Sequence, residues 1–191
     1  MNQNLNHKQV LLIKLAKSFQ LFGNHYMKSL FFLLKSRKDL LVDINADFEK
    51  INTLTYCAVV IFFSYVENTA ISIKRLLIKA LDAETINISS KKQHELVHKD
   101  EDKLSFEDMM KLTFSVFPSL FGAGNHYGDI KHRDLKTLFL LREIRNIIIH
   151  PKGIEDIFVP LNQLGGKDIN LPMMNYLKAL KNLINICAKK I

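Results

Sequence analysis

Apolar residues recur at intervals of three and four along most of the chain, and this spacing constrains the fold more than any other feature of the sequence. Such a pattern places apolar side chains on one face of a helix, whereas a half-buried strand needs a strict alternation that is not found here. It predicts a long amphipathic helix from Leu5 to Leu34, in which Gly23 could introduce a kink. A second helix should begin near Asp47, its N-cap, and continue to about Leu81. We therefore expect an all-α bundle of about four to five main helices.

Further helix signals follow in the second half of the chain. Ser105 and Asp108 form a capping pattern that should open a short helix ending near Pro118. Another main helix is expected from about Ile130 to Ile149. The chain should close with an amphipathic helix that has Pro172 in its first turn, where a missing backbone N–H is tolerated.

Three segments lack the helical pattern. Residues 85–104 are polar and highly charged, so we expect an exposed loop or a solvated helix there. The glycine-rich residues 122–129 should form a flexible loop. Residues 151–172 hold three prolines and three glycines and should be irregular.

Length and composition are those of a single soluble domain. With 191 residues, 48% of them hydrophobic, residues 1–191 can bury one core. Cys57 and Cys187 both lie in apolar helical patterns, which favours a reduced, cytoplasmic protein over a disulfide scaffold. The first residues lack a signal-peptide pattern, and the most apolar run, Leu54 to Val66, is too short to span a bilayer and ends at Glu67. We expect no membrane location.

The net charge of +8 indicates the kind of partner. An excess of basic residues favours a polyanion, with nucleic acid as the first candidate and a membrane surface as the second. Most of these residues are lysines, which are also common on surfaces that bind nothing. The candidates for contact with RNA are His126, Tyr127, Lys131 and Lys152.

The stretch HELVH, His94 to His98, matches the H-E-x-x-H pattern of zinc proteases. That pattern normally lies in a buried helix, because a catalytic metal needs a dry cleft and supporting hydrogen bonds. Here it lies in the most hydrophilic part of the chain, and no third ligand is evident, although Glu107 and His126 could be suggested. We expect a solvated surface and no metal site. The glycine-rich GAGNHYG lacks the spacing of a phosphate-binding loop, so no nucleotide cofactor is expected.

The stretch LREIRNIIIHPKG is the strongest candidate for a functional site. Proline disfavours helical geometry in the residue before it, so the helix should end at Ile149 or His150. The His150 side chain would then be free to turn toward Arg145, and Asn146 could hydrogen-bond either one. Two of the five arginines of the chain, Arg142 and Arg145, fall in this turn, and arginine can grip a phosphate through two parallel hydrogen bonds.

A purely structural role is an open alternative for the same residues. His150 could cap carbonyl groups at the end of the helix while Arg145 pairs with Glu67 or Glu143. Glu67 is the only charged residue between positions 50 and 74, and an unpaired carboxylate on so apolar a helix would be costly. It should therefore face water or meet a cation, either in a structural ion pair or as part of a site.

The pattern R-N-x-x-x-H at the end of a late helix resembles the signature of the HEPN superfamily (higher eukaryotes and prokaryotes nucleotide-binding domains). The resemblance is carried by Arg145, Asn146 and His150. The segment from Phe63 to Leu77 is similar to the family's other recognisable helix, with Glu67 at its polar position. Members are all-α domains, and many are metal-independent endoribonucleases of toxin–antitoxin, abortive-infection and CRISPR systems.

This resemblance is best over residues 50–152 and implies an endoribonuclease that needs no metal or other cofactor. Its implied catalytic residues are Arg145, Asn146 and His150, with Glu67 and Arg142 in support. The RNA 2′-hydroxyl would attack the adjacent phosphate, in a homodimer that brings two sets of these residues together. An antitoxin or another defence-system protein would be a further partner. The alternative is a catalytically silent helical module that binds RNA or a partner protein.

Overall fold

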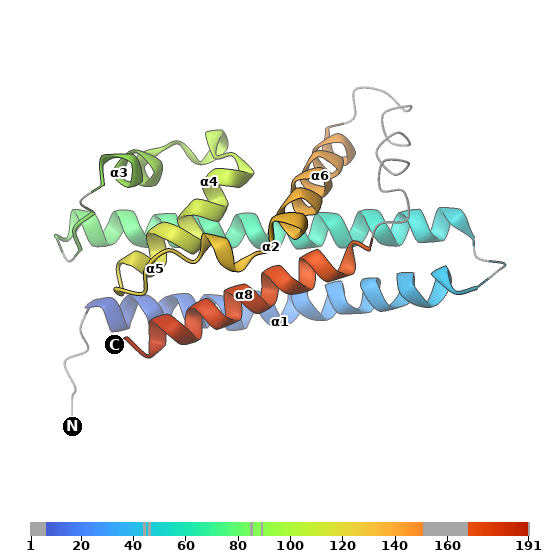
Figure 1. The fold of residues 1–191 in the computed structure, drawn as a ribbon, viewed down its shortest axis with the longest axis horizontal. Coiled ribbons are helices and arrows are strands. Elements are labelled where there is room, and N and C mark those ends of the chain that lie inside the picture. Colours follow the sequence, from blue (N-terminus) through green and yellow to red (C-terminus); the bar gives the residue numbers. More distant parts are fainter. Residues whose placement is uncertain are drawn as a thin grey trace. The chain divides into compact units, whose positions relative to one another are not determined.

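The computed structural model describes residues 7–43, 45, 47–84, 86–88, 90–150 and 168–190, and within these ranges every regular element is a helix (Figure 1). The predicted all-α class is confirmed. The described residues include two 3₁₀ turns, η1 (Glu101–Lys103) and η3 (Tyr127–Asp129), and a π-helix, η2 (Leu112–Val116). The α-helices are α1 (His7–Leu41), α2 (Phe48–Asp82), α3 (Lys91–His98), α4 (Phe106–Lys111), α5 (Phe117–Ser119), α6 (His132–Ile149) and α8 (Asn170–Ala188).

Side-chain caps fix where α2 and α4 begin. The Asp47 carboxylate accepts hydrogen bonds from the backbone N–H groups of Glu49 (2.9 Å) and Lys50 (3.4 Å). At α4, the Ser105 hydroxyl accepts from the backbone N–H of Asp108 at 3.1 Å, and the Asp108 carboxylate accepts from the backbone N–H of Ser105 at 3.0 Å. Each bond satisfies an N–H group that has no partner inside its helix. Both predicted helix starts are confirmed.

Helix α4 passes directly into the π-helix η2 and then into α5, so this helical run ends at Ser119, beside the predicted end at Pro118. The sequence did not predict the π-helix. π-helical turns are rare and cluster at functional sites. Here the carbonyl group of Phe114, inside η2, accepts a hydrogen bond from the backbone N–H of His126 at 2.7 Å, so η2 is tied to the loop that follows it.

Helix α6 begins at His132 and ends at Ile149, as expected from the proline at position 151. Helix α8 begins at Asn170, whose backbone N–H donates to the Asp168 carboxylate at 2.9 Å, and has Pro172 in its first turn as predicted. Residues 151–167 lie outside the described part of the chain, and so does the proposed RNA contact Lys152.

Helix α1 is longer than the sequence predicted, since it continues past Leu34 to Leu41. Its last turns are held by a contact that local periodicity cannot reveal. The Arg37 side chain is only 8% exposed and donates from Nε to the Thr55 hydroxyl of α2 at 2.8 Å. Thr55 in turn donates to the carbonyl group of Ile51 at 2.7 Å, so the buried hydrogen-bonding groups are satisfied. The helix runs unbroken through Gly23.

Contacts between residues divide the chain into two compact units. Unit 1 comprises Met1–Leu21, Val66–Ile130 and Tyr176–Ile191, and unit 2 comprises Phe22–Tyr65 and Lys131–Asn175. Helices α1, α2 and α8 each contribute a part to both units. The expectation of a single domain over residues 1–191 stays a prediction.

Each unit has its own apolar core. In unit 1, the rings of Phe114 and Tyr176 meet edge to face with their centroids 5.4 Å apart, and both side chains are fully buried. In unit 2, Phe62 and Phe63 of α2 make a similar contact at 5.1 Å. Burying one such side chain stabilises the folded state by about 1.5–3 kcal/mol, so these aromatic residues contribute substantially to each core. The fully buried apolar residues that α6 contributes to unit 2 are Leu138, Leu141 and Ile144.

Helix α2 is long enough and apolar enough to cross a membrane, and among the described helices it alone meets that test. The run from Leu54 to Val66 is too short by itself, but the helix continues to Asp82. Half of the most apolar window is buried inside the structure. The core helix of a soluble protein has the same character, so the fold is compatible with the expected soluble protein.

Candidate functional site

The last turns of α6 bring Arg142, Arg145 and Asn146 together. Leu141 and Ile144 are buried in the core of unit 2, and this orientation fixes which face of the helix carries the polar residues. Arg142 and Arg145 are half-buried and Asn146 is exposed. The helical spacing thus gathers two cationic side chains and one amide at the edge of the core.

One oxygen atom links these three residues. The Asn146 side-chain carbonyl accepts a hydrogen bond from Nη1 of Arg145 at 3.2 Å and another from Nη1 of Arg142. The Arg142 guanidinium also lies over the ring of Phe63 in α2, 5.8 Å from its centroid, a cation–π arrangement. Phe63 and Asn146 therefore fix the position of Arg142, and the predicted Asn146–Arg145 contact is observed. Phe63 was missed from the sequence, because its role depends on the packing of α2 against α6.

His150 occupies the C-cap position of α6. Its backbone N–H donates to the carbonyl group of Asn146 at 2.9 Å, with φ −128° and ψ 62°, so the chain has left the helical conformation at this residue. The helix end is thus closed by the backbone of His150, whereas its side chain is exposed. The exposed imidazole and the pair of arginines are carried by the same helix end, and the expected turn of the imidazole toward Arg145 stays a prediction.

Glu67 was expected to support the site. It is half-buried in α2 and belongs to unit 1, whereas Arg145 and His150 belong to unit 2. A pairing of Glu67 with either residue therefore stays a prediction. Glu143, the other carboxylate suggested for Arg145, is exposed.

The glycine-rich loop is fastened by His126. The Nδ1 atom of its ring lies 2.8 Å from the Asp129 carboxylate, and Nε2 lies 2.9 Å from the carbonyl oxygen of Ala123. Gly122 and Gly124 adopt positive φ values of 66° and 83°, which other residues adopt only with strain. His126 therefore has a structural task in holding the loop, and its contact with RNA stays a prediction.

Two further RNA candidates are described. Tyr127 follows His126 and is half-buried, while Lys131 is exposed at the N-cap of α6. Burial raises the pKa of the Tyr127 phenol, the nearby Glu107 carboxylate raises it further, and Lys111 lowers it. The phenol is therefore protonated at neutral pH and can donate a hydrogen bond. Neither residue is shown to contact RNA.

The segment containing HELVH forms helix α3, which corresponds to the solvated helix that was one of the two expectations. Val97 is fully buried and fixes α3 to unit 1, while His94 and His98 are exposed with ring centroids 4.4 Å apart. Glu107, one of the suggested third ligands, pairs with Lys111 at 2.7 Å. Among the described residues no group of three or more His, Cys, Asp and Glu side chains could hold a metal ion.

A cavity of about 370 Å³ in unit 1 was not foreseen from the sequence. It lies between α3, the run from α4 into η2, and the glycine-rich loop. The sequence predicts a charged exposed segment, a short helix and a flexible loop here, and no local pattern relates them to one another. Their association depends on tertiary packing.

No protein-family model, curated protein or solved structure matches the chain.

Proposed function

We propose that the protein is a metal-independent endoribonuclease that cleaves RNA by attack of a 2′-hydroxyl group on the adjacent phosphate. A toxin or a phage-defence effector of the abortive-infection kind fits this activity. The resemblance to the HEPN signature and the net charge of +8 support the proposal.

The observation that carries the proposal is the convergence of two guanidinium groups on the side-chain oxygen of Asn146, at the helix end that also bears the exposed His150. Two cations held this close favour an anion beside them, and guanidinium groups match the geometry of phosphate oxygens. Imidazole is the side chain best suited to move protons near neutral pH. Cleavage of RNA needs both functions.

The steps follow from these roles. His150 removes the proton from the 2′-hydroxyl, and the 2′ oxygen then bonds to phosphorus. Arg145 stabilises the charge that builds on the phosphoryl oxygens, and Asn146 orients the arginines. The bond from phosphorus to the 5′ oxygen breaks, and that oxygen takes a proton, for which a second copy of His150 in a homodimer is the natural donor. The products carry a 2′,3′-cyclic phosphate and a 5′-hydroxyl group.

One observation favours the alternative of a silent helical module that binds RNA or a partner protein. Arg142 is held by Phe63 and Asn146 together, as expected of a side chain that braces a helix end. A protein of that kind would bind RNA through distributed positive charge and leave it intact.

The experiment is incubation of the purified protein with total RNA in the presence of EDTA. His150→Ala should lower the cleavage rate by about 10²–10⁴-fold, because a proton-transferring group is lost. Arg145→Ala should lower it by about 10²–10³-fold, because charge stabilisation is lost. His132→Ala is the matched control, since His132 is an exposed histidine at the other end of α6.

Circular dichroism should show unchanged helix content in all three variants, and the RNA ends should carry cyclic phosphate. An intact RNA substrate with the unmodified protein, or full activity in a folded His150→Ala protein, would rule out the proposed function. A drop in activity that only follows a drop in melting temperature would favour the structural alternative.

A composite site also predicts a homodimer, of about twice 22.1 kDa, in light scattering. A strict monomer at micromolar concentration would contradict the proton donor suggested above. An antitoxin or another defence-system protein would be a further partner of such an enzyme.

A further inference from the structure

The cavity in unit 1 has the size of a small-molecule site. Its volume of about 370 Å³ falls in the range of roughly 300–1,000 Å³ that is typical of ligand pockets. Leu96 of α3, Val116 of η2 and the ring of Tyr127 provide apolar surface. Gln93, Ser115 and Asn125 add neutral polar groups to the same walls. Apolar surface combined with convergent polar groups is what a small organic ligand requires.

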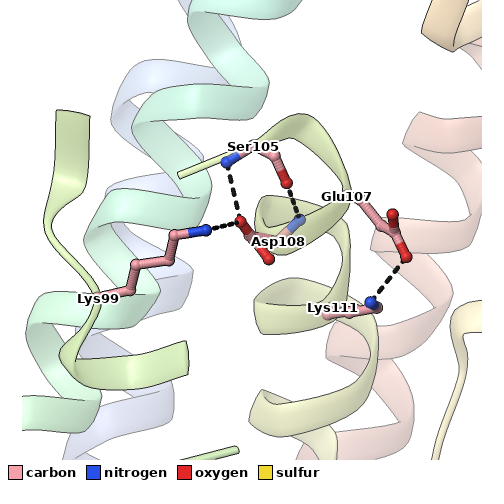
Figure 2. Close-up of polar contacts among 5 residues, drawn as sticks. All are labelled: Lys99, Ser105, Glu107, Asp108 and Lys111. Carbon is pink, nitrogen blue, oxygen red and sulfur yellow. Dashed lines mark hydrogen bonds and ion pairs between the residues drawn. The ribbon is translucent and has the colours of Figure 1, made fainter. Parts of the chain in front are cut away.

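The charged side chains of the wall leave an excess of positive charge. Lys92 and Lys111 line the cavity, and Asp108 is the carboxylate among the lining residues. Asp108 is already engaged, because Lys99 donates to it at 2.6 Å and the backbone N–H of Ser105 at 3.0 Å (Figure 2).

Glu107 and Lys111 neutralise each other at 2.7 Å, as Figure 2 also shows. The ion pair of Lys99 with Asp108 is likewise balanced. Each of these two ion pairs has no net charge. Lys92 therefore leaves one positive charge in excess at the cavity wall. The wall therefore matches a ligand with a single negative charge.

Backbone contacts hold the wall in place before any ligand arrives. The N–H of His126 donates to the carbonyl group of Phe114 in η2, which fixes the loop against the π-helix. The side-chain oxygen of Asn125 accepts from the backbone N–H of Tyr127 at 2.9 Å, so both loop residues that line the cavity are positioned. A preformed wall lowers the ordering cost of binding.

We propose that this cavity binds a small organic carboxylate with an aromatic or otherwise apolar body. The body lies against Leu96, Val116 and the Tyr127 ring, and the carboxylate faces Lys92. The phenol of Tyr127, which is protonated at neutral pH, can donate to the same carboxylate. This site is a different one from the end of α6 and does not depend on the ribonuclease activity.

Three matched probes test the charge preference by isothermal titration calorimetry: 2-naphthoate, the neutral 2-naphthamide and the cationic 2-naphthylmethylamine. They share the same aromatic body and differ in charge. We expect naphthoate to bind about tenfold more tightly than the amide, because the neutral amide forms no ion pair with Lys92, and the amine to bind most weakly. Equal binding of acid and amide, or no binding of naphthoate up to its solubility, would overturn the proposal.

Variants locate the site. Lys92→Gln should remove the preference for naphthoate over naphthamide. Lys91→Gln should keep it, because Lys91 is the neighbouring lysine of α3, with a 91% exposed side chain that pairs with Glu95 and does not line the cavity. Ser115→Leu should fill the space and weaken all three probes, with the melting temperature as the check on folding. Naphthoate binding that is unchanged in Lys92→Gln and Ser115→Leu would place the probe elsewhere and refute the assignment.

Discussion

Asp108 links the end of α3 to the start of α4. Replacing it should lower the free energy of unfolding by more than its partly exposed position suggests. Its carboxylate accepts from Lys99, the C-cap of α3, at 2.6 Å and from the backbone N–H of Ser105 at 3.0 Å (Figure 2). Burial acts to raise the pKa of this carboxyl group and is the largest single influence on it. The hydrogen bonds from Lys99 and Ser105, together with the positive charge of Lys99, outweigh burial and lower the pKa.

The substitution Asp108→Asn keeps the shape of the side chain and one acceptor but removes the charge. A hydrogen bond to a charged group contributes about 1.5–3 kcal/mol, and an N-terminal cap about 1 kcal/mol. The Asp108 side chain is 18% exposed and that of Lys99 is 40% exposed, so solvent screens part of the contribution of their charged hydrogen bond. We expect a loss of about 2 kcal/mol in the free energy of unfolding, which lowers the melting temperature by about 4–8 °C for a chain of this length.

Glu107→Gln is the matched control. Glu107 is the neighbouring carboxylate, and its ion pair with Lys111 has a similar length of 2.7 Å, but about half of each side chain is exposed. Surface ion pairs of this kind contribute about 0–1 kcal/mol, so the control should change stability little. Urea unfolding followed by circular dichroism measures both variants at pH 7.

The pH dependence gives a second readout. Since the pKa of Asp108 is lower in the folded than in the unfolded chain, its contribution is complete well above the unfolded value, about 4. The contribution declines as the pH falls below that value and is lost once the folded carboxyl group is protonated. The difference between the unmodified protein and Asp108→Asn should therefore vanish in strong acid. A difference that persists there, or equal losses in Asp108→Asn and Glu107→Gln, would refute the reasoning.

Two further outcomes follow from the structure. Burial raises the pKa of Cys187 to about 11, whereas Cys57 is exposed, so iodoacetamide at neutral pH should label Cys57 alone in the folded protein and both in urea, as read by mass spectrometry. Replacing the exposed His94 and His98 together by alanine should change stability by less than about 0.5 kcal/mol. Stoichiometric zinc in protein purified without added metal, absent from the double variant, would show instead that the pair binds metal.

The ends of several helices could be predicted because nearby residues determine them. Asp47 and Ser105 cap their own helices through backbone N–H groups two or three residues away. The end of α6 at Ile149 follows from the proline at position 151. The end of α1 could not be predicted, because the turn at Arg37 is held by Thr55, which lies eighteen residues further along the chain.

The candidate site likewise has contacts that nearby residues determine and contacts that depend on residues far away in the sequence. The contact of Asn146 with Arg142 spans four residues, so helical spacing brings these two side chains onto one face of α6. Arg145 is the residue just before Asn146, and its guanidinium group reaches the Asn146 side chain because the arginine side chain is long. The support of Arg142 by Phe63 requires α2 and α6 to pack, and no sequence pattern encodes that register. The cavity wall could be predicted even less from local sequence. It depends on a hydrogen bond to the carbonyl group of Phe114, inside a π-helix that the sequence does not predict, and on a loop that His126 holds in place.

Asn146 offers the sharpest separation between a phosphate-binding and a bracing role for the two arginines. The variant Asn146→Asp keeps the shape of the side chain and replaces a neutral acceptor of both guanidinium groups by a charged one. The two hydrogen bonds from the guanidinium groups would become ion pairs, which at this exposed position should raise stability by about 0.5–1 kcal/mol, whichever role is correct. The roles differ in what happens to RNA. If Arg142 and Arg145 bind phosphate, the carboxylate competes for them, so cleavage must fall sharply while the melting temperature rises. If they only brace the helix end, RNA cleavage or binding should be unchanged in the more stable protein. Unchanged cleavage would remove the arginines from the proposed mechanism even if the protein proved to be a ribonuclease.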